Sequence, residues 1–287
     1  MKSFASQIEL AADAAIDLQM HTIYSDGTWT PERLVDYLIG EQFGLVAITD
    51  HDRVDTASML QQLAAAKGFP ILTAVEMSTT WRGEATDVLC FGFDPEENAL
   101  SALAQEVTRR QSENTRETYE KLCQQGYIQA NQQELDVLLE KPSSSQFEEL
   151  ATLLEKHTHG ADENTLYRRL EEFGFTWITT DIAAVVDAAH RSGAVSLLAH
   201  PGRGEFWTCY DERLLDELRQ EVPIDGFEAY YPKHTPEQTA MYLAYAEKHS
   251  LLVSSGSDSH GPERPPIKYR AELSRKLLER LGVGIGA

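Results

Sequence analysis

Residues 15–27 read AIDLQMHTIYSDG, and this stretch decides how the chain is expected to fold. Its first six residues predict a short strand. A histidine, His21, directly follows that strand, and an aspartate, Asp26, comes five residues later. Functional side chains gather at the carboxyl ends of strands in α/β enzymes. The stretch therefore predicts a strand that delivers polar groups to a site.

Four further apolar strands end in the same kind of group. They are followed by Thr49-Asp50-His51-Asp52, Glu76, His200-Pro201 and Gly256-Ser257-Asp258-Ser259-His260. A single histidine after a strand is most often an ordinary turn residue, but five such ends in one chain favour a shared site. In a β/α barrel these ends converge on one face. Imidazole and carboxylate groups there would suit Zn, Mn or Fe.

The other segments alternate between strands and helices, which predicts an α/β fold with a largely parallel sheet. Thr30 and Pro31 mark the start of one helix, as N-cap and first helical residue. We expect strands at 45–49, 71–75, 85–93, 195–199, 226–229 and 251–254, and helices at 31–40, 55–67, 181–192, 211–220 and 236–249.

The pattern changes after Asp94-Pro95. Residues 97–125 predict one long polar helix, and residues 131–175 have helical periodicity with an excess of acidic residues. We therefore expect a discontinuous domain over 13–94 and 178–287, interrupted by a mainly helical inserted subdomain at 95–177.

Charge and cysteine content restrict the partners. The 25 Lys+Arg and 46 Asp+Glu give a net charge of −21, which argues against binding duplex nucleic acid or an anionic membrane. A small phosphate ligand held by local cations stays possible. No apolar run reaches the roughly 18 residues of a membrane span, and no signal peptide is expected. Three separated cysteines favour reduced thiols and a cytoplasmic protein.

Together, these motifs resemble those of the PHP (polymerase and histidinol phosphatase) superfamily, in particular its nucleoside 3′,5′-bisphosphate phosphatases. The resemblance covers about 13–94 and 178–265 and rests on residues 17–27, 48–52, 75–78, 199–203 and 256–261. It implies a distorted seven-stranded (β/α)7 TIM-like barrel with up to three divalent metals at its C-terminal face. It also implies that the insert caps the active site.

The resemblance assigns ligands residue by residue. His21, Glu76 and Asp258 would hold one metal; Glu76 would bridge to a second metal shared with His200; Asp26, His51 and His260 would hold a third. The chain departs from the family at Gln19 and Asp87, where His is usual. Asp87 favours Mn or Mg over Zn, and Gln19 binds through its amide oxygen or leaves a metal with fewer ligands. We expect two to three divalent ions, with Mn²⁺ first and Zn²⁺, Fe²⁺ or Mg²⁺ as alternatives.

Substrate binding needs cations near these metals. Arg203, directly after His200-Pro201-Gly202, is the first candidate for phosphate, because guanidinium binds phosphate bidentately. Lys233 and His234 follow another strand, and Arg109 and Arg116 share one face of the long helix, which could equally be a solvated face. Arg203 and His234 are also candidates for a catalytic role, and so are Asp50 and Asp52, which would help to position or accept a proton. Trp29 and Trp81 could stack on a base or simply pack.

The sequence therefore predicts a metal-dependent phosphoesterase. Water activated by the metals would hydrolyse a phosphate monoester of a small, nucleotide-like substrate, and the protein would be a monomer or small homo-oligomer. Alternatives are a 5′-end exonuclease on short RNA, a phosphatase for another small phosphate ester, or a PHP-like binding module weakened by Gln19 and Asp87. The chain has no Gly-x-Ser-x-Gly motif, which disfavours a serine nucleophile.

Overall fold

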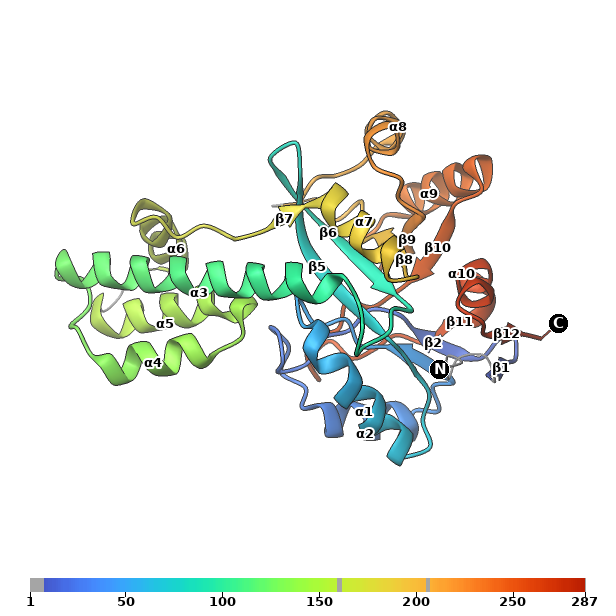
Figure 1. The fold of residues 1–287 in the computed structure, drawn as a ribbon, viewed down its shortest axis with the longest axis horizontal. Helices are drawn as coiled ribbons and strands as arrows, with labels where there is room; N and C mark the ends of the chain where they lie inside the picture. Colours follow the sequence, from blue (N-terminus) through green and yellow to red (C-terminus); the bar gives the residue numbers. More distant parts are fainter. Residues whose placement is uncertain (1–7, 159–161, 205–206, 287) are drawn as a thin grey trace. The chain divides into compact units, whose positions relative to one another are not determined.

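The computed structural model describes residues 8–158, 162–204 and 207–286. The chain divides into two compact units, residues 1–104 with 179–287 and residues 105–178 (Figure 1). The first turns of helix α3 (Leu100–Gln124) belong to the first unit, because Leu100 and Ala104 are buried in its core. Residues 95–104, which the sequence assigned to the insert, therefore lie in the first unit.

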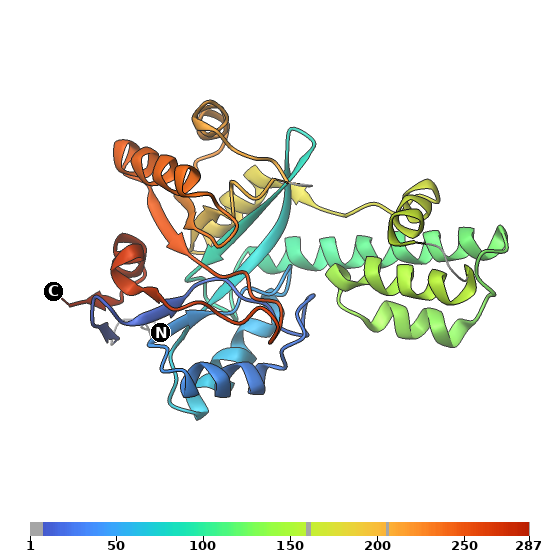
Figure 2. The same cartoon turned by 180° about the vertical axis from the view of Figure 1, so that it is seen from behind.

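The described strands of the first unit form three sheets. The largest has the order β10-β9-β8-β6-β5-β7, the second the order β11-β2-β3-β4, and β1 pairs with β12 (Figure 2). Their bounds are β1 Glu9–Leu10, β2 Ala15–Asp17, β3 Leu45–Ala47, β4 Ile71–Leu72, β5 Ala74–Trp81, β6 Glu84–Phe91, β7 Thr180–Asp181, β8 Val195–Leu198, β9 Gly226–Tyr230, β10 Leu252–Ser255, β11 Tyr269–Arg270 and β12 Gly284–Ile285.

The sheets are mixed: among the described strands six pairings are parallel, as the prediction of a largely parallel sheet requires, and three are antiparallel. β6 runs antiparallel to both β5 and β8, and β11 runs antiparallel to β2. The physical reason lies in the two-residue connection between β5 and β6. Arg82 and Gly83 both have positive φ, 53° and 86°, as a tight hairpin turn of the primed type requires. The α/β class is confirmed, but the sheets do not join into one closed ladder.

Short contacts connect the sheets where the strands end. The backbone N–H of Glu76 donates to Thr49 O at 3.2 Å, and that of Asp52 donates to Glu76 O at 2.9 Å. On the other side, the N–H of His21 donates to Ser259 O at 2.8 Å. The segment that follows β3 is thereby placed beside β5, and the segments that follow β2 and β10 are placed beside each other.

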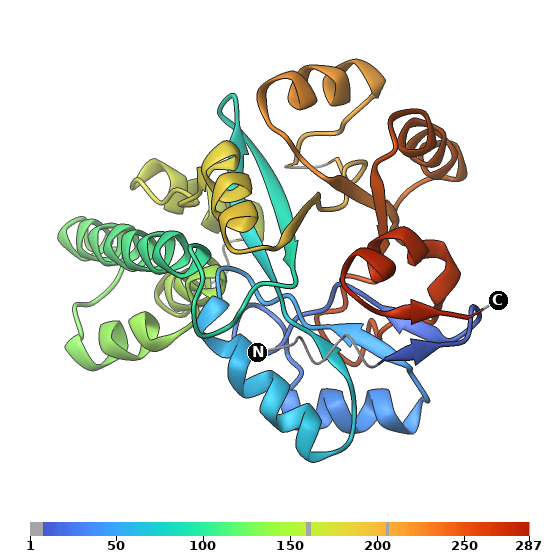
Figure 3. The ribbon, with the colours of Figure 1, turned by 45° about the vertical axis from the view of Figure 1, so that its right-hand side comes forward.

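Helices lie around the outside of these strands (Figure 3). Thr30 caps α1 as expected, its side chain accepting from the N–H of Arg33, and Pro31 is the first helical residue. Buried apolar side chains such as Leu34, Leu38 and Val186 face the strands. The helices are α1 Pro31–Gly40, α2 Ala57–Ala66, α7 Ile182–Arg191, α8 Glu212–Glu221, α9 Pro236–His249 and α10 Arg275–Arg280.

The described residues of the second unit form helices joined by loops and include no strand. The remainder of α3 packs with α4 (Gln132–Glu140), α5 (Gln146–Thr158) and α6 (Glu163–Glu172) around a core that includes Leu122, Leu150 and Leu170. None of the helices within the described ranges has both the length and the apolar character that crossing a membrane requires.

Gly226 provides a test of the packing between β9 and β10. A Cβ atom at this position would lie 2.0 Å from Leu252 O in the neighbouring strand. Gly226→Ala should lower the free energy of unfolding by about 2–4 kcal/mol, because backbone must move to admit the methyl group. Gly40→Ala is the control, since nothing lies within 4 Å of its Cβ position. Urea denaturation should show destabilisation in the first variant only; equal stability of the two would refute this packing.

Candidate metal centre

Eight of the predicted ligands come together in three groups of side chains. Within each group, one potential ligand atom per residue lies within 4.8 Å of the others. His21 and Glu76 each belong to two groups, so the three groups are contiguous. The groups are His21, Asp26, His51 and His260; His21, Glu76 and Asp258; and Glu76, Asp87 and His200.

Glu76 and Asp87 lie within β5 and β6, which corrects the prediction that a strand ends before Glu76. His200 and Asp258 follow β8 and β10, where the chain turns sharply. His200 and Asp258 have positive φ values, 27° and 52°, and so does Asp52 beside His51, at 53°. Non-glycine residues rarely adopt this conformation, and such strain is concentrated at functional sites.

Glu76 lies at the centre of the cluster and is completely buried. Its carboxylate oxygens lie 3.1 Å from His21 Nε2 and 3.0 Å from His200 Nε2. The amide nitrogen of Gln19 donates to Glu76 Oε2 at 3.0 Å. Burial opposes ionisation, but the charge of His51 and a hydrogen bond from His200 outweigh it, and the pKa of Glu76 is held well below its usual range.

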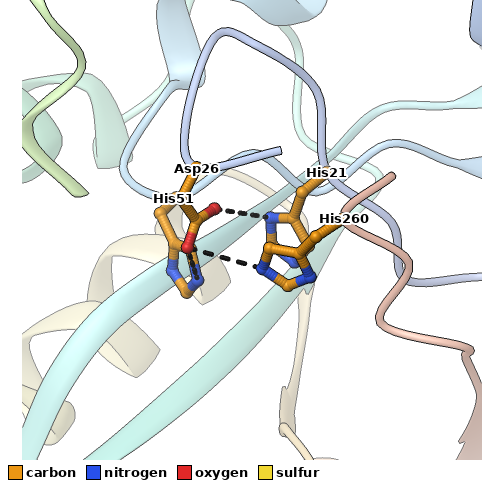
Figure 4. A group of neighbouring side chains, drawn as sticks. All are labelled: His21, Asp26, His51 and His260. Atoms are coloured by element: carbon orange, nitrogen blue, oxygen red, sulfur yellow. Dashed lines mark ion pairs between the residues drawn. The ribbon is translucent and has the colours of Figure 1, made fainter. Parts of the chain in front are cut away.

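Asp26 faces three imidazole rings (Figure 4). Its oxygens lie 3.4 Å from His260 Nε2, 3.7 Å from His21 Nδ1 and 3.9 Å from His51 Nε2. Although burial acts in the opposite direction, the charge of His51 and a hydrogen bond from His260 lower the pKa of Asp26. The His21 and His260 rings stack with their centres 4.3 Å apart, so their nitrogens crowd into one small volume.

The pKa values of the imidazoles are raised, whereas those of Glu76 and Asp26 are lowered. Burial lowers the pKa of His21, but hydrogen bonds to Asp258 and Glu76 raise it well above its usual value. For His51 too, burial is outweighed, here by the charges of Glu76 and Asp26, and its pKa is raised. Asp258 is fully buried, and despite that burial its hydrogen bond to His21 lowers its pKa.

Several buried polar atoms of the cluster have no hydrogen-bond partner among the described residues. They are His51 Nδ1, Asp26 Oδ1 and Gln19 Oε1. Buried polar atoms are normally paired, and three exceptions in one place indicate that the cluster is built for a ligand. The donors are imidazole nitrogens and carboxylate oxygens, which suit divalent cations. The residues present therefore fit a divalent metal cluster.

Asp50 and Asp52 are both buried beside this cluster. The Asp50 carboxylate accepts from Thr22 N at 2.6 Å and from Ser25 Oγ at 2.8 Å, so it holds the loop that carries Asp26. Asp52 Oδ1 accepts from Ser78 N at 3.1 Å, and burial raises the pKa of Asp52 to about 7. These contacts give Asp50 and Asp52 positioning roles, and their catalytic roles stay predictions.

Arg203, one of the predicted substrate residues, lies beside these groups, with Nη1 3.6 Å from Asp258 Oδ2. His234 holds the same loop, because its Nε2 accepts from Gly202 N at 3.0 Å and its Nδ1 donates to Ala229 O at 3.1 Å. Burial lowers the pKa of His234, which keeps the ring neutral for both bonds.

The remaining predicted substrate cations are exposed. Lys233 lies in the loop after β9, next to His234. Arg109 and Arg116 belong to the second unit, and Arg109 pairs with Glu106 and Glu113 on its own helix. The two tryptophans considered for base stacking, Trp29 and Trp81, are buried in the first unit, which favours the packing alternative.

Three residues of the site were missed by the sequence analysis. Arg264 Nη2 lies 3.0 Å from His260 Nδ1, the hydroxyl of Tyr231 donates to Asp258 Oδ2 at 3.2 Å, and Trp207 Nε1 donates to Asp87 Oδ2 at 2.6 Å. Each of these residues lies in a segment that follows a strand and also contains a predicted ligand or substrate residue. That position in the sequence was the signal by which they could have been found.

Comparison with known proteins agrees with this geometry. No family model matches the chain. It is 30% identical over 275 residues, 93% of this chain and 90% of the relative, to the 5′-3′ exoribonuclease Rnm of Salmonella typhimurium. It is 28% identical to the 3′,5′-nucleoside bisphosphate phosphatase of Chromobacterium violaceum, over 87% of this chain and 88% of the relative.

A solved structure from Bifidobacterium adolescentis, described as a metal-dependent phosphoesterase, has the same fold. It superposes with a TM-score of 0.75 at 22% identity and covers 95% of this chain and 97% of its own. The ligand groups, the shared fold and the relatives that match along nearly the whole chain agree with one another. The chain belongs to the PHP superfamily and is a metal-dependent phosphoesterase.

Proposed function

We propose that this enzyme removes a phosphate group from a small nucleotide, of the nucleoside 3′,5′-bisphosphate type. The observation that carries the proposal is the contiguous set of three ligand groups joined through His21 and Glu76, with Arg203 beside Asp258. A relative whose alignment covers 87% of this chain is named a phosphatase of this substrate.

The eight clustered residues would hold two or three divalent ions, with Gln19 as a further oxygen donor. When bound, the ions would neutralise phosphoryl oxygens and make water a stronger nucleophile at neutral pH. The donors contain no thiolate, and carboxylates contribute half of them, so we favour Mn²⁺ over Zn²⁺. We also propose that the strands of the first unit correspond to the barrel of the superfamily.

The chain's own residues would bind and orient the phosphate. Arg203 has a buried Nε without a hydrogen-bond partner among the described residues, and its guanidinium can donate to two phosphate oxygens at once. His234 and Asp50 would act at a distance, by fixing the loops that carry Arg203 and Asp26. Arg109, Arg116 and Lys233 remain candidates for a second phosphate group.

A 5′-3′ exoribonuclease activity on short RNA is the second candidate, because the Salmonella relative is named for it and matches 93% of the chain. Both reactions hydrolyse a phosphate ester, so the same cluster would serve either one. The net charge of −21 favours the smaller substrate.

A direct comparison of the two substrates tests the proposal. With added Mn²⁺, the protein should release inorganic phosphate from adenosine 3′,5′-bisphosphate, and EDTA should abolish the release. Release of mononucleotides from 5′-phosphorylated RNA, without phosphate release from the bisphosphate, would select the second candidate. Inactivity on both substrates would contradict both proposals.

Asp26→Asn tests the ligand cluster, because it keeps the size of the side chain and removes its charge. We expect kcat/KM to fall by about hundredfold or more, with weaker Mn²⁺ binding and an unchanged circular dichroism spectrum. Asp13→Asn is the control, an exposed aspartate between β1 and β2. Full activity of Asp26→Asn at limiting Mn²⁺ would remove Asp26 from the proposed ligands.

The shifted pKa values predict how the stability of the metal-free protein depends on pH. The raised pKa values of His21 and His51 contribute stability below about pH 6.5, and this is lost as the pH rises through their folded values. The lowered pKa values of Glu76 and Asp258 contribute stability above about pH 4, lost on acidification. In EDTA, the free energy of unfolding should therefore be highest between about pH 4 and about pH 6.5.

Each unit of raised histidine pKa corresponds to about 1.4 kcal/mol. With Mn²⁺ the alkaline loss should disappear, because metal binds neutral imidazole. Denaturation at pH 5.5, 7 and 8.5, with and without Mn²⁺, measures both trends. Stability of the metal-free protein that increases up to pH 8.5 would contradict this account of the cluster.

A further inference from the structure

Trp207 and Thr208, which come after β8, lie along β6, next to one of the ligand groups. Thr208 N donates to Ala85 O at 3.1 Å, which fixes the loop to the first part of the strand. Two residues further along β6, the carboxylate of Asp87 accepts a hydrogen bond of 2.6 Å from Trp207 Nε1. The loop therefore places an indole N–H directly against Asp87.

The same indole also supports the arginine proposed to bind phosphate. The guanidinium carbon of Arg203 lies 3.8 Å from the centre of the Trp207 ring. Contacts of this kind are worth about 0.5–2 kcal/mol. Because Arg203 Nη1 is also 3.6 Å from Asp258 Oδ2, the ring holds the guanidinium against the cluster.

The hydrogen bond from Trp207 suits a metal-binding carboxylate that must keep one orientation. Asp87 is buried, and its Oδ2 lies 4.0 Å from His200 Nε2. The terminal torsion of an aspartate is soft, so packing alone defines its carboxylate plane poorly. An indole N–H only donates, so it can orient the carboxylate without competing for a cation. The remaining lone pairs of Asp87 stay available to the group it shares with Glu76 and His200.

We propose that Trp207 is a positioning residue that orients Asp87 for metal binding through its N–H and holds Arg203 for phosphate binding through its ring. This inference rests on the proposed function only for Arg203. The Asp87 part concerns metal binding and is measured without substrate.

Trp207→Phe tests the Asp87 part, because it keeps an aromatic ring under Arg203 and removes the donor. We expect isothermal titration calorimetry of the metal-free variant with Mn²⁺ to show that the affinity of one class of sites is about 10- to 100-fold weaker than in the wild type. Trp81→Phe is the matched control, since Trp81 Nε1 donates to Glu221 Oε2 at 2.8 Å, a carboxylate outside the three groups. It should bind Mn²⁺ like the wild type.

A double-mutant cycle separates orientation of Asp87 from a general structural effect. If Trp207 acts through Asp87, Trp207→Phe should weaken Mn²⁺ binding in the wild type and cause no further loss in Asp87→Ala. Equal losses in the two backgrounds, or no loss in either, would overturn the assignment. Lack of Mn²⁺ binding by the wild type would overturn it together with the proposed function.

Trp207→Leu tests the Arg203 part, because it removes the ring as well. At saturating Mn²⁺, KM for adenosine 3′,5′-bisphosphate should be roughly 2- to 30-fold higher than in Trp207→Phe, the range that corresponds to the cation–π energy. In an Arg203→Ala background the two variants should have the same KM. Equal KM values with Arg203 present would overturn this part. Absence of hydrolysis by the wild type would refute the proposed substrate, and the metal titration would still decide the role of Asp87.

Discussion

The structure of the first unit depends on the burial of one carboxylate, that of Glu76. Placing an isolated charge of this kind in a protein interior costs several kcal/mol unless partners compensate for it. Here the partners are the imidazoles of His21 and His200 and the amide of Gln19. They come from segments far apart in the sequence, so the strands must converge at Glu76 for the charge to be tolerated.

That convergence explains the unusual backbone around the cluster. The N–H of Glu76 donates to Thr49 O, and the carbonyl of Glu76 accepts from the N–H of Asp52. The segment after β3 is therefore joined to β5 at Glu76. Asp52, His200 and Asp258 then turn with positive φ. These strained turns persist because buried hydrogen bonds and charges determine the positions of the side chains around them.

Much of the fold and the cluster could be predicted from the sequence, because both depend on local signals. Helix α9 covers 236–249 as expected, since Thr235 caps it and Pro236 occupies its first position. Most of the ligands were found because they follow apolar strands, whereas Asp87, which lies within β6, was assigned only through the resemblance to the superfamily. The hairpin between β5 and β6 was missed because its only signal is the pair Arg82-Gly83. Two-residue strands such as β7 and β12 carry no periodicity at all.

The contact between Trp207 and Asp87, in contrast, could not be predicted from the sequence. It depends on the path of a loop across a strand about 120 residues away in sequence, and no local pattern specifies such a path. The same holds for Arg264, which joins Arg203 beside Asp258. These two arginines matter because the chain carries a charge of −21. An anionic substrate is repelled by most of such a protein and attracted only where cations are concentrated. Arginines placed beside a metal cluster create that local field, so the acidic surface and the phosphate chemistry are compatible.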